Sequence, residues 1–239
     1  MKTSPLHVGI VACSAAGASL CYRTICEEGA QLFGPHAHPE VSMHTPSLAL
    51  YVECLERGDW DGVGELMLAS AAKLAAIGAD FLICPDNTIH QALPRVLARS
   101  PLPWLHIAEV VAQEAADRGF RQLGITGTRW LVDSAVYPQA VEALGMGWLR
   151  PVDAERDEMN RVIMDELVCG VLRPESVAVF QRAIERMKGE GCDAVVLGCT
   201  EIPLIVSDAN SALPTLDSTR LLARAALRRA AGAAAAAPR

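Results

Sequence analysis

Two short polar stretches, each directly after an apolar run, carry the residue types that could perform acid–base chemistry. They read FLICPDNTIH (81–90) and AVVLGCTEIP (194–203). The first places Asp86 just beyond its apolar run, and the second places Cys199 there. A carboxylate and a thiol can each remove or deliver a proton when their surroundings adjust their pKa values. The pattern therefore predicts a proton-transfer site built from two strand ends.

An internal repeat relates these two stretches. At an offset of 113 residues (191 minus 78), GADFLICPDNTIH (78–90) aligns with GCDAVVLGCTEIP (191–203), and Asp86 falls on Cys199. Such a repeat indicates two related α/β halves. Ligands of open α/β sheets bind outside the carboxyl ends of the strands. We therefore expect pseudo-two-fold symmetry to place Asp86 and Cys199 on opposite sides of one small-molecule cleft.

The elements that must position these residues follow from apolar runs alternating with segments of helical periodicity. Continuous apolar strands separated by helices indicate a parallel sheet covered on both faces. The predicted strands are residues 7–13, 41–45, 79–84, 122–127 and 192–198, and the predicted helices are residues 19–33, 61–77, 156–171 and 175–188. The expected fold class is α/β, with two pseudo-symmetric lobes, each a mainly parallel sheet flanked by helices, and the active site in the cleft between them.

The domain boundaries follow from the same pattern. We expect an N-terminal lobe over residues 1–110, with part of the C-terminal segment returning to it, and a second lobe over residues 111–215. A C-terminal helix is predicted for residues 216–229. The last ten residues, AAGAAAAAPR (230–239), are a low-complexity tail.

Composition excludes several classes of function. The net charge of −7 argues against a nucleic-acid partner, and no apolar run approaches the roughly 18–20 residues needed to span a bilayer. No secretory signal is evident at the N-terminus. The eight cysteines are scattered without CxxC or other metal-ligand spacing, so we expect reduced thiols, no metal site and a cytoplasmic location.

Each candidate residue has a structural interpretation beside the catalytic one. Cys199 suits acid–base work, because a thiol has a pKa near about 8.5 that a helix N-terminus can lower, but free cysteines are often small core residues. Asp86 could act as a base or could cap the helix that follows it, and the sequence leaves both open. The candidate substrate-binding residues, which offer hydroxyl, amide and turn groups to a carboxylate, are Ser14, Asn87, Thr88, Thr128, Thr200 and Glu201.

The paired stretches DNTIH (86–90) and GCTEIP (198–203) resemble those of the aspartate/glutamate racemase superfamily. The likeness extends to ERGDWDGVGELM (56–67), LPWLHIAEVV (102–111), GITGTRWLVDS (124–134), MNRVIMDELVCG (159–170) and LPTLDST (213–219). The resemblance implies two similar α/β lobes, usually a homodimer, and no pyridoxal phosphate, metal or other cofactor. It also implies two residues, commonly both cysteines, that act on opposite faces of the α-carbon of an amino acid.

Mapped by motif, the second of these residues is Cys199, and the first falls on Asp86, where the family usually has cysteine. No Lys or Arg lies between Met43 and Glu56, so the Arg that holds the substrate side chain in several aspartate racemases has no counterpart there. The leading interpretation is a cofactor-independent amino acid racemase or epimerase, an isomerase acting on amino acids and derivatives. The alternatives are a single-cysteine decarboxylase of malonate-type acids and a non-catalytic binder of small carboxylates.

Overall fold

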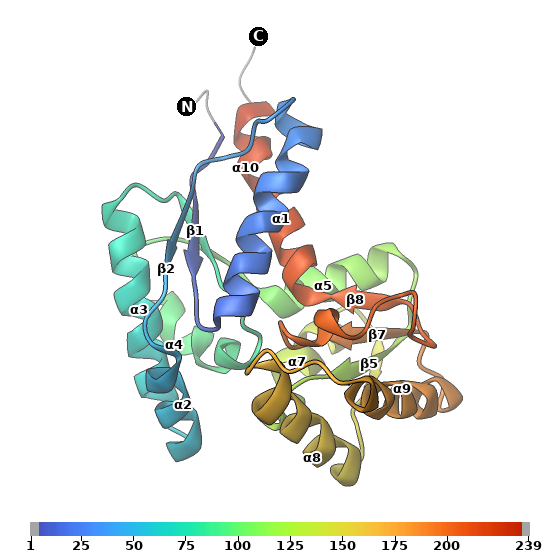
Figure 1. Ribbon diagram of the computed structural model, residues 1–239. Helices are drawn as coiled ribbons and strands as arrows, with labels where there is room; N and C mark the ends of the chain where they lie inside the picture. Colours follow the sequence, from blue (N-terminus) through green and yellow to red (C-terminus); the bar gives the residue numbers. More distant parts are fainter. Residues whose placement is uncertain (1–4, 236–239) are drawn as a thin grey trace. The chain divides into compact units, whose positions relative to one another are not determined.

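The computed structural model describes residues 5–235, with side chains through residue 232, and forms two compact units (Figure 1). The first unit comprises Met1–Ile107 and Thr219–Arg239, and the second comprises Ala108–Ser218. Each unit contains one four-stranded sheet in which every pair of neighbouring strands is parallel. The α/β, two-lobe fold class predicted from the alternating pattern is therefore confirmed.

The first unit is built on strands β1 (Val8–Val11), β2 (Val41–His44), β3 (Phe81–Ile83) and β4 (Trp104–Leu105), in the order β2-β1-β3-β4. Its helices are α1 (Ala15–Phe33), α2 (Leu48–Arg57), α3 (Trp60–Ala76), the 3-10 helix η1 (Thr88–Ala92), α4 (Leu93–Leu97) and α10 (Ser218–Ala235). In Figure 1, α1 and α10 lie on one side of β1 and α3 lies on the other. The sheet is therefore covered on both faces, which explains why β1 and β3 are apolar at nearly every position.

The second unit repeats this plan with β5 (Gln122–Thr126), β6 (Gly147–Leu149), β7 (Ala194–Leu197) and β8 (Thr215–Asp217), in the order β6-β5-β7-β8. Its helices are α5 (Ile107–Asp117), α6 (Arg129–Val132), α7 (Val136–Glu142), α8 (Asp153–Arg161), the π-helix η2 (Val162–Leu167), α9 (Pro174–Gly189) and the 3-10 helix η3 (Ile202–Leu204). Strands β1 and β3 thus correspond to β5 and β7, the two central strands of each sheet.

The repeat in the sequence has a matching hydrogen-bond pattern at the amino ends of these strands. Asp80, before β3, accepts the backbone N–H of His7 at 2.8 Å. Asp193, before β7, accepts the N–H groups of Arg121 at 2.7 Å and Gln122 at 3.1 Å. In both units, therefore, an aspartate holds the start of one central strand to the start of its neighbour.

The glycine two residues before each aspartate is explained by backbone conformation. Gly78 has φ +92° and Gly191 has φ +98°, values that a residue with a Cβ rarely adopts. Each ends the helix that precedes the strand, α3 in the first unit and α9 in the second. The backbone conformation therefore accounts for the repeated glycines, independently of any chemistry at the candidate site.

Two predicted elements differ from the structure. The helix predicted for residues 156–171 starts at Asp153, changes to the π-helix η2 at Val162 and ends at Leu167, where the Val168 N–H bonds the Ile163 carbonyl at 3.0 Å, five residues back. The predicted tail 230–239 is helical through Ala235, because α10 packs back onto the first unit, with its Ala230 carbonyl bonded to the Leu6 N–H. Residues 236–239 of that tail lie outside the described residues.

Within residues 5–235, no helix combines the length and the apolar character that a membrane span requires. None of the eight cysteines, all of which lie in this range, forms a disulfide.

Candidate active site

The candidate residues of the first unit lie at the carboxyl ends of β1 and β3. These strands are paired, with Ile10 opposite Ile83, so the turns that follow them are adjacent. Asp86 Oδ2 accepts the backbone N–H groups of Cys13 at 3.2 Å and Ser14 at 3.1 Å. Two amide donors from the β1–α1 turn therefore hold the Asp86 side chain at the edge of the sheet.

Asp86 is not the N-cap of the helix that follows it. That helix is the 3-10 helix η1, whose N-cap residue is Asn87, and the Asn87 side chain makes no capping bond. The hypothesis that Asp86 is the N-cap of this helix is therefore wrong, because Asn87 holds that position. The Asp86 carboxylate reaches across to the neighbouring turn. The catalytic hypothesis for Asp86 stays a prediction.

The candidate binding residues of this unit surround the same edge. Ser14 is the N-cap of α1, and its Oγ accepts the Gly17 N–H at 3.3 Å. Asn87 is buried and Thr88 is half-buried at the start of η1. The structure thus brings Ser14 and Asn87 to the two turns that Asp86 joins, and a role for them or for Thr88 in binding substrate stays a prediction.

Two buried groups, Cys84 and Tyr51, interact electrostatically with Asp86. Burial and the Asp86 carboxylate raise the pKa of the Cys84 thiol well above its ordinary value, so this thiol stays protonated. Burial, and then the neighbouring Cys84, Cys13 and Asp86, raise the pKa of Tyr51. Tyr51 comes from α2, more than thirty positions from Asp86 along the chain, and no spacing in the sequence connects the two.

The candidate residues of the second unit lie at the carboxyl ends of β5 and β7. Gly198 follows β7, and its N–H bonds the Thr126 carbonyl at 3.0 Å. A Cβ on Gly198 would overlap that carbonyl oxygen and lie 2.6 Å from Leu131 Cδ2. Only glycine therefore allows the chain to turn here, directly before Cys199.

Cys199, Thr200 and Glu201 form a buried hydrogen-bonded group. The Cys199 Sγ–H donates to Glu201 Oε2 at 2.9 Å, and the Thr200 hydroxyl donates to the same oxygen at 2.6 Å. All three side chains are at least nine-tenths buried. In this arrangement the Glu201 carboxylate can take the thiol proton and leave a thiolate, the form of cysteine that abstracts protons and attacks carbon.

This geometry changes the interpretation of two sequence features. The helix expected to activate Cys199 is only the three-residue η3, and the Cys199 thiol contacts the Glu201 carboxylate. Thr128 is the N-cap of α6 and accepts the Leu131 N–H at 3.3 Å, and Thr126 donates to the Val196 carbonyl at 2.7 Å. A role for Thr128, Thr200 or Glu201 in binding substrate stays a prediction.

Comparison with known proteins identifies the family. The family model for Asp/Glu/Hydantoin racemases matches residues 10–226. The chain belongs to the Asp/Glu/hydantoin racemase family. This racemase-family chain is 23% identical over 170 residues to a broad-specificity amino-acid racemase of Bacillus subtilis (strain 168), a match that covers 70% of the chain and 71% of the relative. It is 27% identical over 151 residues to a glutamate racemase of Thermus thermophilus, a match that covers 62% of the chain and only 54% of that enzyme.

Solved structures agree with this assignment. A Yersinia pestis protein provisionally described as an Asp/Glu racemase superposes with a TM-score of 0.84 at 26% identity, covering 94% of this racemase-family chain and 99% of the other. An aspartate racemase homologue from Pyrococcus horikoshii OT3 has a TM-score of 0.80 at 25% identity, with coverage of 94% and 98%. The two-unit fold is therefore that of Asp/Glu racemases.

Proposed function

We propose that this protein is a cofactor-independent amino acid racemase or epimerase in which Cys199 and Asp86 act on opposite faces of the substrate α-carbon. The observation that carries the proposal is the buried Cys199–Glu201 pair at the end of a central strand. It supplies a thiol hydrogen-bonded to a carboxylate that can accept its proton during the reaction, in a chain of the racemase family.

In the proposed reaction, Glu201 first accepts the Cys199 proton, and the resulting thiolate removes the α-proton of the substrate. A protonated Asp86 then delivers a proton to the opposite face of the carbanion-like carbon. The product has inverted configuration, Cys199 carries the abstracted proton, and Asp86 is left ionised. The reverse reaction uses the same groups in opposite roles, and proton exchange with solvent resets each of them.

The negative charge that develops during proton removal requires hydrogen-bond donors at the strand ends. The proposed donors are the turn amides with Asn87, Thr88 and Thr128, and Ser14 would help to place the substrate carboxylate. The proposed substrate is an amino acid or an amino acid derivative, as in the Bacillus subtilis relative. Homodimerisation and a cytoplasmic location stay predictions from the sequence.

The test is proton NMR in D2O with a panel of L- and D-amino acids, applied to the wild type, Cys199→Ser and Asp86→Asn. We expect the α-proton signal of at least one amino acid to be lost with the wild type and retained with both variants. Asp86→Asn keeps the shape of the side chain and an oxygen that can accept the Cys13 and Ser14 amides. Its effect on exchange therefore reports the carboxylate as an acid–base group.

Three outcomes would contradict parts of the proposal. Exchange that survives Asp86→Asn would make Cys199 a lone base. Release of CO2 from a malonate-type acid, without exchange of any amino acid, would indicate a decarboxylase. Thermal stabilisation by small carboxylates with no turnover would indicate a binding protein.

A further inference from the structure

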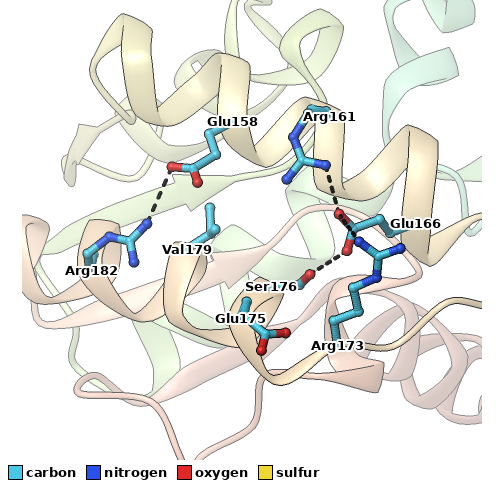
Figure 2. Close-up of a pocket in the computed structure, with 8 residues that line it drawn as sticks. All are labelled: Glu158, Arg161, Glu166, Arg173, Glu175, Ser176, Val179 and Arg182. Atoms are coloured by element: carbon cyan, nitrogen blue, oxygen red, sulfur yellow. Dashed lines mark hydrogen bonds and ion pairs between the residues drawn. The ribbon is translucent and has the colours of Figure 1, made fainter.

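A polar pocket of about 370 Å³ lies within the second unit, lined by α8, the π-helix η2 and the start of α9 (Figure 2). Its volume is in the range of cavities that hold small ligands. It contains none of the residues proposed to act on the α-carbon. Its lining includes three arginines and three glutamates, so its formal charges cancel.

The floor of the pocket is the buried carboxylate of Glu166, whose negative charge is already balanced by Arg161. Arg161 Nη1 donates to Glu166 Oε1 at 2.7 Å, and the Ser176 hydroxyl donates to Glu166 Oε2. These bonds from Ser176 and Arg161 hold the pKa of Glu166 below its usual value. Arg161 and Glu166 are five residues apart, a spacing that the wider turn of η2 brings onto one face. The π-helix therefore builds the floor.

The walls of the pocket carry an ion pair between Arg182 and Glu158, and two charged side chains, those of Arg173 and Glu175, that form no side-chain hydrogen bond within the described part of the chain. Arg182 Nη2 donates to Glu158 Oε2 at 3.4 Å. Arg173 Nη1 forms a long ion pair with Glu166 Oε1 at 4.0 Å, beyond hydrogen-bond distance, and the Arg173 side chain is 60% exposed. Among the side chains described in residues 5–232, neither Arg173 nor Glu175 forms a hydrogen bond, and Glu175 forms no ion pair. Figure 2 shows both at the end of the pocket that Glu166 and Ser176 close.

We propose that this pocket binds an α-amino acid as a zwitterion at a second site, separate from the proposed active site. Arg173 would hold the ligand carboxylate in a bidentate pair, and Glu175 would hold its ammonium group. A simple anion would bring a negative charge close to the glutamate carboxylates as well as to the arginines, which is unfavourable. A zwitterion presents one group of each sign, so each group can face a side chain of opposite charge. The balance of three arginines with three glutamates therefore favours an amino acid over a phosphate or a dicarboxylate.

The test is a two-dimensional ¹H–¹⁵N NMR titration of the full chain, following the backbone amides of Ser176 and Val179. This readout reports the pocket alone, so it is independent of whether the protein racemises amino acids. The probes are L-alanine, propionate, which lacks the ammonium group, and ethylamine, which lacks the carboxylate. We expect saturable shifts with L-alanine, and affinities weaker by about tenfold or more for the other two.

Variants locate the two contacts. Arg173→Gln and Glu175→Gln are each expected to weaken L-alanine binding by about tenfold or more, and Arg121→Gln, at an exposed arginine of the same unit outside the pocket, is expected to leave it unchanged. Absence of saturable shifts with L-alanine would overturn the proposal. Binding of propionate as tight as that of L-alanine would overturn it too, because the pocket would then be a simple anion site.

Discussion

Acidification is expected to destabilise this protein through one buried imidazole, that of His90 in η1. His90 Nε2–H donates to the Cys84 carbonyl at 3.0 Å. Nδ1 is buried and has no hydrogen-bond partner among the described residues. Burial, and then the neighbouring His106, whose ring centroid lies 4.7 Å away, lower the pKa of His90 to about 3. The imidazole of His90, which follows Asp86 by four residues in the chain, therefore stays neutral in the folded protein.

The direction of the effect follows from proton binding. Between about pH 6.5, the ordinary pKa of histidine, and about pH 3, the unfolded chain binds a proton at His90 and the folded chain does not. The contribution of the neutral His90 ring to the free energy of unfolding is therefore complete above about pH 6.5 and is lost as the pH falls through this window. At about pH 4.5, two pH units below the unfolded value, the loss is about 2.7 kcal/mol, because each unit costs about 1.36 kcal/mol.

The assay is urea denaturation at several values between about pH 7.5 and pH 4.5, for the wild type and His90→Gln. The glutamine amide can still donate to the Cys84 carbonyl but cannot take up a proton. Carboxyl groups with lowered pKa values, such as Glu28 and Glu155, contribute equally to both proteins. The difference between the two curves therefore isolates the imidazole.

We expect the wild type to lose about 2.7 kcal/mol more than His90→Gln between pH 7.5 and pH 4.5. If the free energies of unfolding of the wild type and of His90→Gln change by the same amount between pH 7.5 and pH 4.5, His90 titrates normally in the folded protein. The argument from its burial and its unpartnered Nδ1 would then be refuted.

Two further variants test the second unit. Glu201→Gln should slow α-proton exchange by about 100-fold or more, the usual contribution of a positioned acid–base group, with Glu185→Gln, at an exposed carboxylate of α9, as the control. An unchanged exchange rate would mean that Cys199 does not need the carboxylate. Gly198→Ala should cost at least about 2 kcal/mol in thermal denaturation because its Cβ has no room. Gly189→Ala, in a helix and facing open space, should stabilise by roughly 0.5–1 kcal/mol, and equal effects of the two would contradict the packing argument.

Much of the fold could be predicted from the sequence, because its signals are local. Continuous apolar runs marked β1, β3, β5 and β7 as buried strands. The repeat at an offset of 113 residues predicted two related units, and its glycines and aspartates proved to have matching roles at Gly78, Gly191, Asp80 and Asp193. The strands β4, β6 and β8 have only two or three residues, too few to show a period.

The π-helix η2 could not be predicted from the periodicity of apolar residues. Residues 156–171 carry a helical pattern, but a single wide turn changes which side chains share a face without changing the composition of the segment. The π turn brings Arg161 and Glu166 together, and only the packing of η2 against α9 brings Ser176 to them. The pocket beside them could not be anticipated from spacing.

For the candidate site, the sequence by itself determined which residues stand at the strand ends: Asp86 after β3 and Cys199 after β7. The tertiary structure decided which groups those residues contact. Asp86 bonds the amides that follow β1, seventy-odd residues away, instead of capping its own helix. Glu201, whose role in binding substrate stays a prediction, accepts a hydrogen bond from the Cys199 thiol. The physical reason is that a hydrogen bond forms only when donor and acceptor lie within a few tenths of an ångström of about 2.9 Å, and the chain reaches such distances only after the strands have paired.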